Sequence, residues 1–238
     1  MKSLDVIILV GGLGTRLRDT VPDVPKPLAQ ISETPFLTLL LDQLAHYEWI
    51  NSVILAVGYK AEKIVDLYCN HDYSFDIIFS HENMPLGTGG ALRNAYDKIT
   101  TDSVMVMNGD SFLKSDLSGL YECHRCNNND VTITLIQFED TSRYGTVEID
   151  GYQRILSFRE KTENNNPGLI NAGIYIFKRE IILSIETGKK LSLEHNFFNQ
   201  ISSYKGYGWI TNGKFIDIGT KESYAESEDF FRGHTNAK

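Results

Sequence analysis

Two glycine-rich stretches have the composition needed to bind a ligand through the backbone. The first, GGLGTRL at residues 11–17, directly follows an apolar run at residues 6–10. Glycines let backbone N–H groups approach a ligand without a Cβ in the way, and several such groups near a helix N-terminus form an anion cradle. We therefore expect residues 11–16 to bind phosphate, although a plain tight turn between strand and helix would have the same composition.

The second stretch, PLGTGGAL at residues 85–92, would let a base or ribose lie against bare backbone, or it is an ordinary helix entry. Neither stretch is a known nucleotide fingerprint by itself. Residues 11–17 lack the Gly-Lys-Ser/Thr of a P-loop, and Leu17 stands where the dinucleotide fingerprint has its third glycine.

Two cations accompany the first stretch. Arg16 belongs to it, and Lys26 lies between Pro25 and Pro27. Two prolines predict a stiff, extended chain around the lysine. A lysine held in this way presents a fixed point charge to phosphate oxygens, whereas a solvated loop lysine is the simpler alternative.

Two carboxylates are candidates for a metal site. Asp110 closes the segment Asn108-Gly109-Asp110 after an apolar run, and Asp217 is flanked by apolar residues. Two carboxylates combined with phosphate oxygens and water suit Mg²⁺. Each aspartate taken alone would more simply cap a turn.

The pair Cys123 and Cys126 is not a zinc site, because a structural zinc needs four ligands and no second pair exists at a matched spacing.

The elements that must position these groups alternate along the first half of the chain. Apolar runs predict buried strands at residues 6–10, 53–57, 77–79 and 104–107, with helices at 36–47, 61–69 and 90–99 between them. This alternation predicts an α/β fold with a mostly parallel sheet, in which ligands lie beyond the carboxyl ends of the strands. Strands predicted at 131–138, 145–149, 154–159 and 170–177 form a strand-rich lobe, and a helix at 222–231 follows.

Composition narrows the class of protein. The chain has 238 residues, 42% of them hydrophobic, and a net charge of −8. This charge disfavours nucleic acid or an anionic membrane as the main partner. The early apolar run is too short to span a bilayer, and three cysteines without an export signal favour the cytoplasm. We expect one domain over residues 1–238, and an oligomer is possible.

The order and spacing of these motifs resemble the sugar-1-phosphate nucleotidyltransferases over nearly the whole chain. The resemblance continues through residues 143–145, 160–161, 171–175 and 192–194, and it departs from the usual pattern at residues 18–20. It implies a Rossmann-like, glycosyltransferase-A-like fold without a hexapeptide-repeat domain. It also implies that a nucleoside triphosphate and a sugar 1-phosphate react to give a nucleotide sugar and pyrophosphate. A non-catalytic regulatory subunit on the same fold is the alternative from another class.

The resemblance also assigns roles to residues of this sequence. It implies that Arg16 and Lys26 bind the triphosphate, that Asp110 and Asp217 hold Mg²⁺, and that Lys161 orients the sugar 1-phosphate. It implies a nucleotide site of Leu9, Gly11, Gly12, Gly14, Thr15, Arg16, Lys26, Glu82, Gly87, Thr88, Asn108 and Asp110, and a sugar-phosphate site of Gly109, Tyr144, Gly145, Glu160, Lys161, Asn171, Gly173 and Asp217.

Glu82 indicates which base the nucleotide substrate carries. Relatives that use thymidine or uridine nucleotides often carry a glutamine at the corresponding place. A carboxylate only accepts hydrogen bonds, which matches the adjacent N1–H and N2–H donors of guanine and not the single N–H of uracil. GTP is therefore the expected nucleotide. Similarity to short guanylyltransferases favours a manno-heptose 1-phosphate as the sugar, with mannose 1-phosphate, or a hexose 1-phosphate used with dTTP or UTP, as alternatives.

Overall fold

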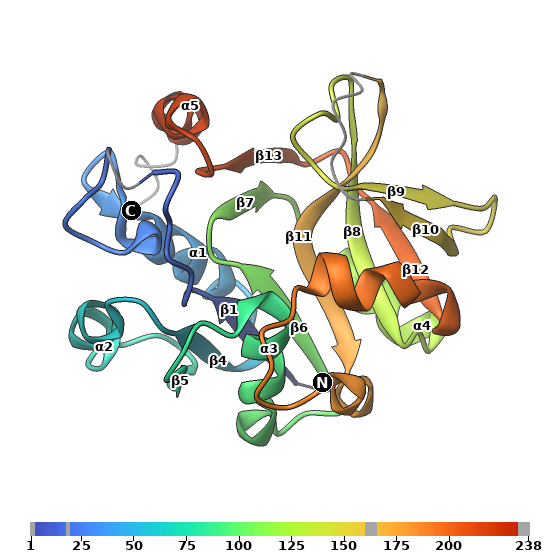
Figure 1. The fold of residues 1–238 in the computed structure, drawn as a ribbon, viewed down its shortest axis with the longest axis horizontal. Helices are drawn as coiled ribbons and strands as arrows, with labels where there is room; N and C mark the ends of the chain where they lie inside the picture. Colours follow the sequence, from blue (N-terminus) through green and yellow to red (C-terminus); the bar gives the residue numbers. More distant parts are fainter. Residues whose placement is uncertain (1–2, 18–19, 160–165, 233–238) are drawn as a thin grey trace.

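The computed structural model describes residues 3–17, 20–159 and 166–232. Its centre is a nine-stranded sheet in the order β10-β9-β11-β6-β1-β4-β5, in which β8 also pairs with β11, and β12 with β8 (Figure 1). Four adjacent strands of the first half are parallel: β6 (Ser103–Asn108), β1 (Leu4–Leu9), β4 (Ile50–Val57) and β5 (Asp76–His81). The predicted α/β class and the parallel arrangement of these four strands are confirmed.

Helices cover both faces of the parallel strands, which explains why these strands are apolar without alternation. Alternate β1 residues Val6 and Ile8 belong to one core cluster, and Ile7 belongs to the other. The first cluster includes buried residues of α1 (Phe36–Leu44), α2 (Ala61–Tyr68), α4 (Ser118–Asn127) and α5 (Lys221–Phe231). The second includes residues of α3 (Gly87–Asn94) and of the 3-10 and π turns between residues 179 and 203.

The second half of the chain adds antiparallel strands to the same sheet. Strand β11 (Gly168–Lys178) is antiparallel to β6 and joins the parallel strands to the strand-rich lobe. This lobe contains β8 (Val131–Phe138), β9 (Thr146–Ile149), β10 (Ile155–Arg159) and β12 (Gly206–Ile210), as expected except for β12. The sheet is therefore mixed, with its parallel part in the first half of the chain.

Two small sheets lie outside the main sheet. The pair β2 (Gln30–Ile31) and β3 (Thr34–Pro35) forms a short hairpin before α1. Strands β7 (Ser111–Lys114) and β13 (Lys214–Asp217) are antiparallel, and their register places Asp217 opposite Ser111. No simple sequence pattern predicts this last pairing. It places Asp217 close to the carboxyl end of β6.

One local expectation was wrong. Residues Lys26–Leu28 form a 3-10 turn rather than extended chain, because only Pro25 is extended and Pro27 fits the start of a helical turn. Pro35 is the N-cap of α1, and residues 15–17, which end the glycine-rich loop, form a turn.

The amino ends of the parallel strands are closed by a buried carboxylate. Asp5 on β1 is fully buried and accepts hydrogen bonds from Asn51, Ser52, Thr100 and Thr101. Among the described residues, none of the helices combines the length and apolar character needed to cross a bilayer.

Candidate active site

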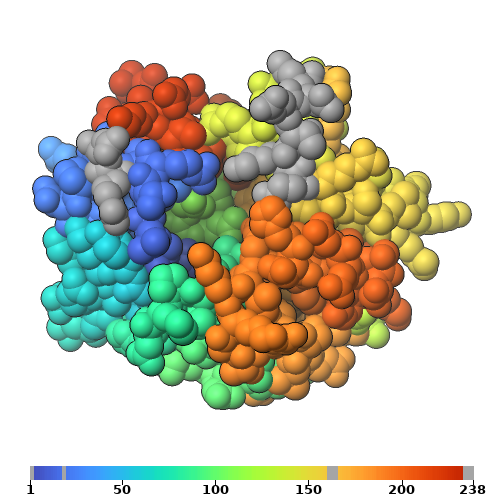
Figure 2. Space-filling model, viewed as in Figure 1, coloured from blue at the N-terminus to red at the C-terminus, as the bar shows by residue number. Residues whose placement is uncertain are grey.

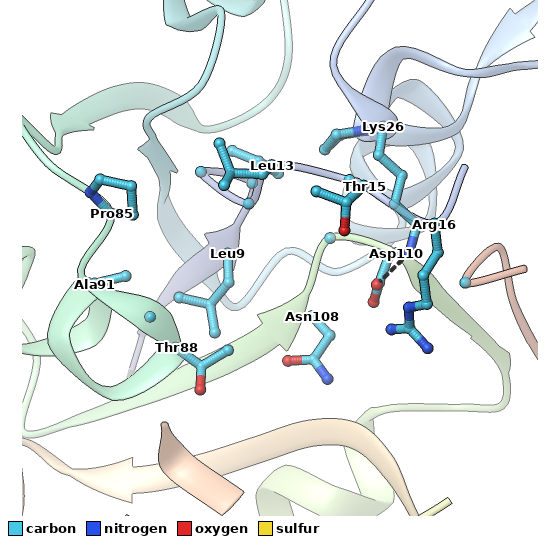
Figure 3. Close-up of a pocket in the computed structure, with 18 of the residues that line it drawn as sticks. Leu9, Leu13, Thr15, Arg16, Lys26, Pro85, Thr88, Ala91, Asn108 and Asp110 are labelled. Atoms are coloured by element: carbon cyan, nitrogen blue, oxygen red, sulfur yellow. Dashed lines mark hydrogen bonds and ion pairs between the residues drawn. The ribbon is translucent and has the colours of Figure 1, made fainter. Parts of the chain in front are cut away.

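A cavity of about 500 Å³ lies at the carboxyl ends of β1 and β6 (Figure 3). In the space-filling view the surface is hollowed there, between the N-terminal part of the chain in blue and the orange segment near residues 180–200 (Figure 2). The cavity brings together every residue expected in the nucleotide site and also Gly109. These lining residues are Leu9, Gly11, Gly12, Gly14, Thr15, Arg16, Lys26, Glu82, Gly87, Thr88, Asn108, Gly109 and Asp110.

The glycine-rich loop after β1 presents free backbone donors to this cavity. In the part of the chain that the structure describes, the amides of residues 12–16 have no hydrogen-bond acceptor. The loop is held at both ends: the Tyr59 amide donates to the Gly11 carbonyl (3.2 Å), and the Leu17 amide donates to the Gly14 carbonyl (3.1 Å). A row of unpaired N–H groups beside Arg16 and Lys26 is suited to polyanion binding.

Glu82 lines the same cavity as these cations. Its Oε2 accepts a hydrogen bond from the Leu86 amide (2.9 Å). A Cβ on Gly11 would come within 2.7 Å of its Oε1, so glycine is required at position 11 for this approach. Burial raises the pKa of Glu82, and the Leu86 amide only partly offsets this. The Leu86 amide therefore holds Oε2, whereas Oε1 accepts no hydrogen bond from the residues that the structure describes.

The start of α3 lies against the segment that precedes the π turn at Leu193–Phe197. Gly87 has a φ of +70°, and a Cβ there would lie 2.5 Å from the Leu191 carbonyl oxygen. The Gly89 amide donates to this same carbonyl (2.8 Å), and the Leu191 amide donates to the Leu86 carbonyl (2.8 Å). These contacts bring Lys190 and Glu194 to the wall of the cavity.

Lys26 and Asp110 form an ion pair in the cavity, beside the glycine-rich loop. Lys26 Nζ lies 2.6 Å from Asp110 Oδ2, and the side chains are 11% and 41% exposed. Partial loss of water raises the pKa of Asp110, but the Lys26 ammonium, helped by Arg16, outweighs this and holds the pKa below its usual range. Asp110 is therefore ionised and open to the cavity.

A second cavity of about 350 Å³ adjoins the first and shares Arg16, Asn108, Asp110 and Gly219 with it. Its other lining residues include four that were expected in the sugar-phosphate site: Tyr144, Asn171, Gly173 and Asp217. The shared residues form the boundary between the two cavities, so ligands in the two cavities would meet beside Asp110.

Asp217 is held by four donors at this boundary. Its Oδ2 accepts from the Tyr144 hydroxyl (2.7 Å) and from the Arg143 guanidinium (3.1 Å). Its Oδ1 accepts from the Gly219 amide (2.6 Å) and from Ser223 Oγ (3.3 Å). The Ile218 amide donates to the Asp110 carbonyl (2.8 Å), which fixes the segment of Asp217 against that of Asp110.

The floor between the two aspartates carries polar atoms without partners. Asn108 Oδ1 and Ser111 Oγ are buried and have no hydrogen-bond partner among the described residues. Gly173 leaves room for them, because a Cβ there would lie 2.7 Å from Asn108 Nδ2. Nearby, Asn171 Nδ2 donates to the Tyr175 hydroxyl (2.7 Å). Unpartnered buried polar atoms at the meeting point of two cavities are typical of a ligand site.

Some expected residues are placed elsewhere. Gly145 lines neither cavity; its carbonyl accepts from the Asn171 amide (3.0 Å), and a Cβ on it would clash with Phe158. Glu160 and Lys161 lie outside the described residues. Conversely, Lys190 and Glu194 line the first cavity and Arg143 contacts Asp217, roles that the sequence did not assign. Arg143 and Glu194 belong to the segments 143–145 and 192–194, which was the available signal, whereas Lys190 belongs to no such segment.

Among the described residues there is no cluster of three or more histidine, cysteine or acidic side chains suited to a metal ion. Cys123 and Cys126 are free thiols on α4. Asp110 and Asp217 therefore supply at most two protein carboxylates, and further oxygen ligands would have to come from substrate and water.

Comparison with known proteins identifies the family. A model described as "Nucleotidyl transferase" matches residues 5–232. A D-glycero-alpha-D-manno-heptose 1-phosphate guanylyltransferase of Aneurinibacillus thermoaerophilus is 38% identical, covering 94% of this chain and 97% of that protein. A mannose-1-phosphate guanylyltransferase of Mycobacterium tuberculosis is 37% identical, covering 97% of this chain and 65% of that protein.

Comparison with solved structures indicates the same family. The crystal structure of HddC from Yersinia pseudotuberculosis complexed with GMP-PN superposes with a TM-score of 0.84 at 35% identity, covering 96% of this chain and 99% of that chain. With its mixed sheet, its paired cavities and these relatives, the chain belongs to the nucleotidyl transferase family.

Proposed function

We propose that this chain is a sugar-1-phosphate guanylyltransferase, which converts GTP and a sugar 1-phosphate to a GDP-sugar and pyrophosphate. The observation that carries the proposal is the pair of adjoining cavities. One has a glycine-rich loop with Arg16 and Lys26, the other has Asn171 and Asp217, and both are bordered by Asp110. Family membership and guanylyltransferase relatives support it.

The proposed chemistry needs positioning and charge neutralisation more than proton transfer. The oxygen of a sugar phosphate is already a nucleophile, and it attacks the α-phosphorus of GTP while pyrophosphate leaves. Free amides of residues 12–16, Arg16 and Lys26 would hold the triphosphate and the departing pyrophosphate. Lys161 would orient the sugar phosphate. Holding two anions in line and neutralising their charge lowers the barrier by the routes available to phosphoryl transfer.

Lys26 would exchange partners during binding. Without substrate its ammonium is neutralised by Asp110 at 2.6 Å. A triphosphate in the first cavity would compete for this ammonium and leave Asp110 free to accept another cation. This exchange leaves the Asp110 carboxylate without its counter-charge at the boundary between the two substrates when both are bound.

Mg²⁺ fits the residues at the boundary between the cavities. Asp110 is exposed there, Asp217 is fixed beside its segment, and a hard cation with two carboxylates and further phosphate and water oxygens is a common magnesium site. When bound, the ion would neutralise charge that develops on the α-phosphate. Asp110 and Asp217 would hold it, and Tyr144, Arg143 and the Gly219 amide would keep Asp217 oriented.

Glu82 would select guanine. The Leu86 amide uses one acceptor position of its Oε2, whereas Oε1 lies beside Gly11 and has free positions. The two oxygens would accept from N1–H and N2–H of guanine. Uracil or thymine would place a carbonyl oxygen against one of them. A bidentate match of this kind discriminates between bases by about 1–3 kcal/mol.

For the sugar we propose a D-glycero-alpha-D-manno-heptose 1-phosphate, with mannose 1-phosphate as the second candidate. The heptose guanylyltransferase relative is 38% identical to this chain, and the mannose enzyme is 37% identical. Asn171, Tyr144 and Glu160 would contact the sugar. A cytoplasmic location stays a prediction from the sequence.

Pyrophosphate release tests the proposal. GTP, dTTP, UTP, CTP and ATP are each combined with heptose, mannose, glucose and N-acetylglucosamine 1-phosphates. We expect turnover with GTP and the heptose or mannose phosphate. A preference for UTP or dTTP would refute the guanine assignment, and no release with any pair would favour a regulatory subunit.

The variant Glu82→Gln isolates the base contact. We expect its kcat/KM for GTP to fall about 10- to 100-fold, because one acceptor becomes a donor facing guanine. Glu48→Gln, on the exposed segment before β4, is the matched control and should change nothing.

A further inference from the structure

The segment Lys189–Glu194, here called the α3 strap, forms one wall of the first cavity and has no assigned role. Its Leu191 carbonyl accepts from the Gly89 amide (2.8 Å), so it is fixed to the first turn of α3. Glu194, at the end of the strap, is half-buried and lines the same cavity as the glycine-rich loop.

The Glu194 carboxylate is held in one orientation by two hydroxyl groups. Its Oε2 accepts from Ser192 Oγ (2.8 Å) and from Thr88 Oγ1 (3.1 Å). Each hydroxyl in turn accepts from a backbone amide: Thr88 Oγ1 from Leu193 (2.8 Å), and Ser192 Oγ from His195 (3.2 Å). Since a hydroxyl has one hydrogen, both hydrogens of this network are directed at Oε2.

The other oxygen, Oε1, has no partner among the described residues, and no described lysine or arginine is paired with Glu194. This arrangement differs from the other carboxylates at the site, because Asp110 and Asp217 each contact a cation. An oriented carboxylate without a counter-charge, in a cavity that also takes a triphosphate, would repel phosphate. It is suited to a neutral donor such as a sugar hydroxyl.

We propose that Glu194 Oε1 accepts a hydrogen bond from a ribose hydroxyl of the bound nucleotide, and so takes part in recognition of the ribose. This proposal rests on the proposed function. Glu194 lines the first cavity and not the second, which points to the ribose rather than to the hydroxyls of the sugar 1-phosphate. In the view of Figure 3 its partner Thr88 lies between Ala91 and Asn108, with Asp110 and Arg16 beyond Asn108.

The test compares GTP with 2′-deoxy-GTP and 3′-deoxy-GTP in the wild type and in Glu194→Gln. In the wild type we expect kcat/KM to fall about 10- to 100-fold for the analogue that lacks the bound hydroxyl, which is the usual value of a charge-assisted hydrogen bond. In Glu194→Gln, GTP should lose a similar factor, while the sensitive analogue should react as it does with the wild type. Glu180→Gln, an exposed glutamate outside both cavities, is the control and should match the wild type.

Two results would overturn the proposal. If Glu194→Gln lowers kcat/KM equally for all three nucleotides, the carboxylate only supports the strap. If it instead raises KM for the sugar 1-phosphate and leaves the preference for GTP unchanged, the hydroxyl belongs to the acceptor sugar.

Calorimetric binding of the three nucleotides, measured without sugar phosphate, separates this proposal from the proposed function. Discrimination by Glu194 without turnover would refute the proposed activity alone. Turnover without discrimination would refute the role of Glu194 alone.

Discussion

The two ends of the parallel sheet each carry an aspartate, and the two are held in opposite ways. Asp5 lies at the start of β1, paired in register with Val104 of β6, and is fully buried. Its Oδ1 accepts from Asn51 (2.7 Å) and Ser52 (2.8 Å), and its Oδ2 accepts from the amides of Thr100 (2.6 Å) and Thr101 (3.1 Å). All these donors are neutral and belong to fixed elements.

Asp110 follows the other end of β6 and has a different environment. Its side chain is 41% exposed, and its partner is the ammonium of Lys26, which ends a flexible side chain. A carboxylate saturated by neutral, fixed donors stabilises a structure, whereas one held by a movable cation beside a cavity can change partners. The environment of Asp5 thus suits a structural carboxylate, and the environment of Asp110 suits a carboxylate that binds a ligand.

The largest expected effect is on turnover by Asp110→Asn. Loss of the charge removes the proposed magnesium ligand and the partner of Lys26, so we expect kcat to fall by about 10²–10³-fold or more. Urea unfolding should change by less than about 1 kcal/mol, because the side chain is partly solvated. A variant that turns over normally would contradict the role of Asp110.

The opposite result, a loss of stability without a loss of turnover, is expected for Asp5→Asn. An amide group cannot accept all the hydrogen bonds that the carboxylate accepts, so we expect the free energy of unfolding to fall by about 3 kcal/mol. The kcat of the folded fraction should be unchanged. Urea unfolding and pyrophosphate release, measured on one preparation, check both statements, and a loss of turnover without a loss of stability would invert the comparison.

The same variant has a predicted pH dependence. Burial raises the pKa of Asp5, but hydrogen bonds from Asn51, Thr100 and Ser52 outweigh this and lower it below 3.8. A lowered pKa in the folded state gives stability that is present above about pH 3.8 and is lost as the pH falls through the folded value. This acid-dependent loss should be absent from Asp5→Asn.

His124 extends the comparison at the same end of the sheet. Burial, aided by the charge of Lys178, lowers its pKa from 6.5 to about 4. Its ring contacts Ser103 and Thr132 and is neutral in the folded state at pH 7. The unfolded chain takes up a proton first as the pH falls, so stability should decrease from pH 6.5 downward, by about 1 kcal/mol at pH 5.5 and about 3 kcal/mol at pH 4.

The variant His124→Gln should flatten this slope, since glutamine does not titrate. Urea unfolding at several pH values between 4 and 7 measures the slope, and turnover at pH 7.5 should be retained. A slope that is the same in both proteins would show that other groups cause the acid sensitivity.

Much of the fold could be predicted from the sequence, because local patterns determine it. The apolar runs at residues 53–57 and 104–107 became β4 and β6, and the glycines after β1 marked the ligand edge. The pairing of β7 with β13 could not be predicted, because it joins residues about a hundred positions apart and each strand has only four residues. The 3-10 turn at Lys26–Leu28 was missed for a related reason, since tertiary contacts decide between two conformations that proline allows.

In the candidate site, too, residues placed by local patterns could be predicted and residues placed by tertiary contacts could not. Groups that follow strands, such as Asn108 and Asp110, were located from the ends of apolar runs. The α3 strap was not, because Glu194 reaches the cavity through contacts with Thr88 that no periodicity encodes. Likewise, no sequence pattern indicated that the Tyr144 hydroxyl contacts Asp217.

Asp217 is held both by neutral donors, as Asp5 is, and by a cation, as Asp110 is. Tyr144→Phe removes only one of these contacts and therefore has the smallest expected effect. Asp217 accepts from a cation, Arg143, and also from neutral donors, including Tyr144 at 2.7 Å. Removing the Tyr144 hydroxyl leaves the contacts with Arg143, the Gly219 amide and Ser223, so the carboxylate should remain nearly in place. The loss of one hydrogen bond of about 1 kcal/mol should lower kcat by about fivefold.

The division of this small effect between kcat and KM is the informative part. If Tyr144 acts by orienting Asp217, kcat falls and KM for the sugar 1-phosphate stays constant, whereas a hydroxyl that binds the sugar directly would raise KM. Tyr152→Phe, at a hairpin tip where the side chain is 82% exposed, is the matched control and should change neither constant. A drop in kcat as large as that of Asp110→Asn would contradict the orienting role. In Tyr144→Phe the Asp217 carboxylate is still present and still accepts from three donors, so the loss should be much smaller.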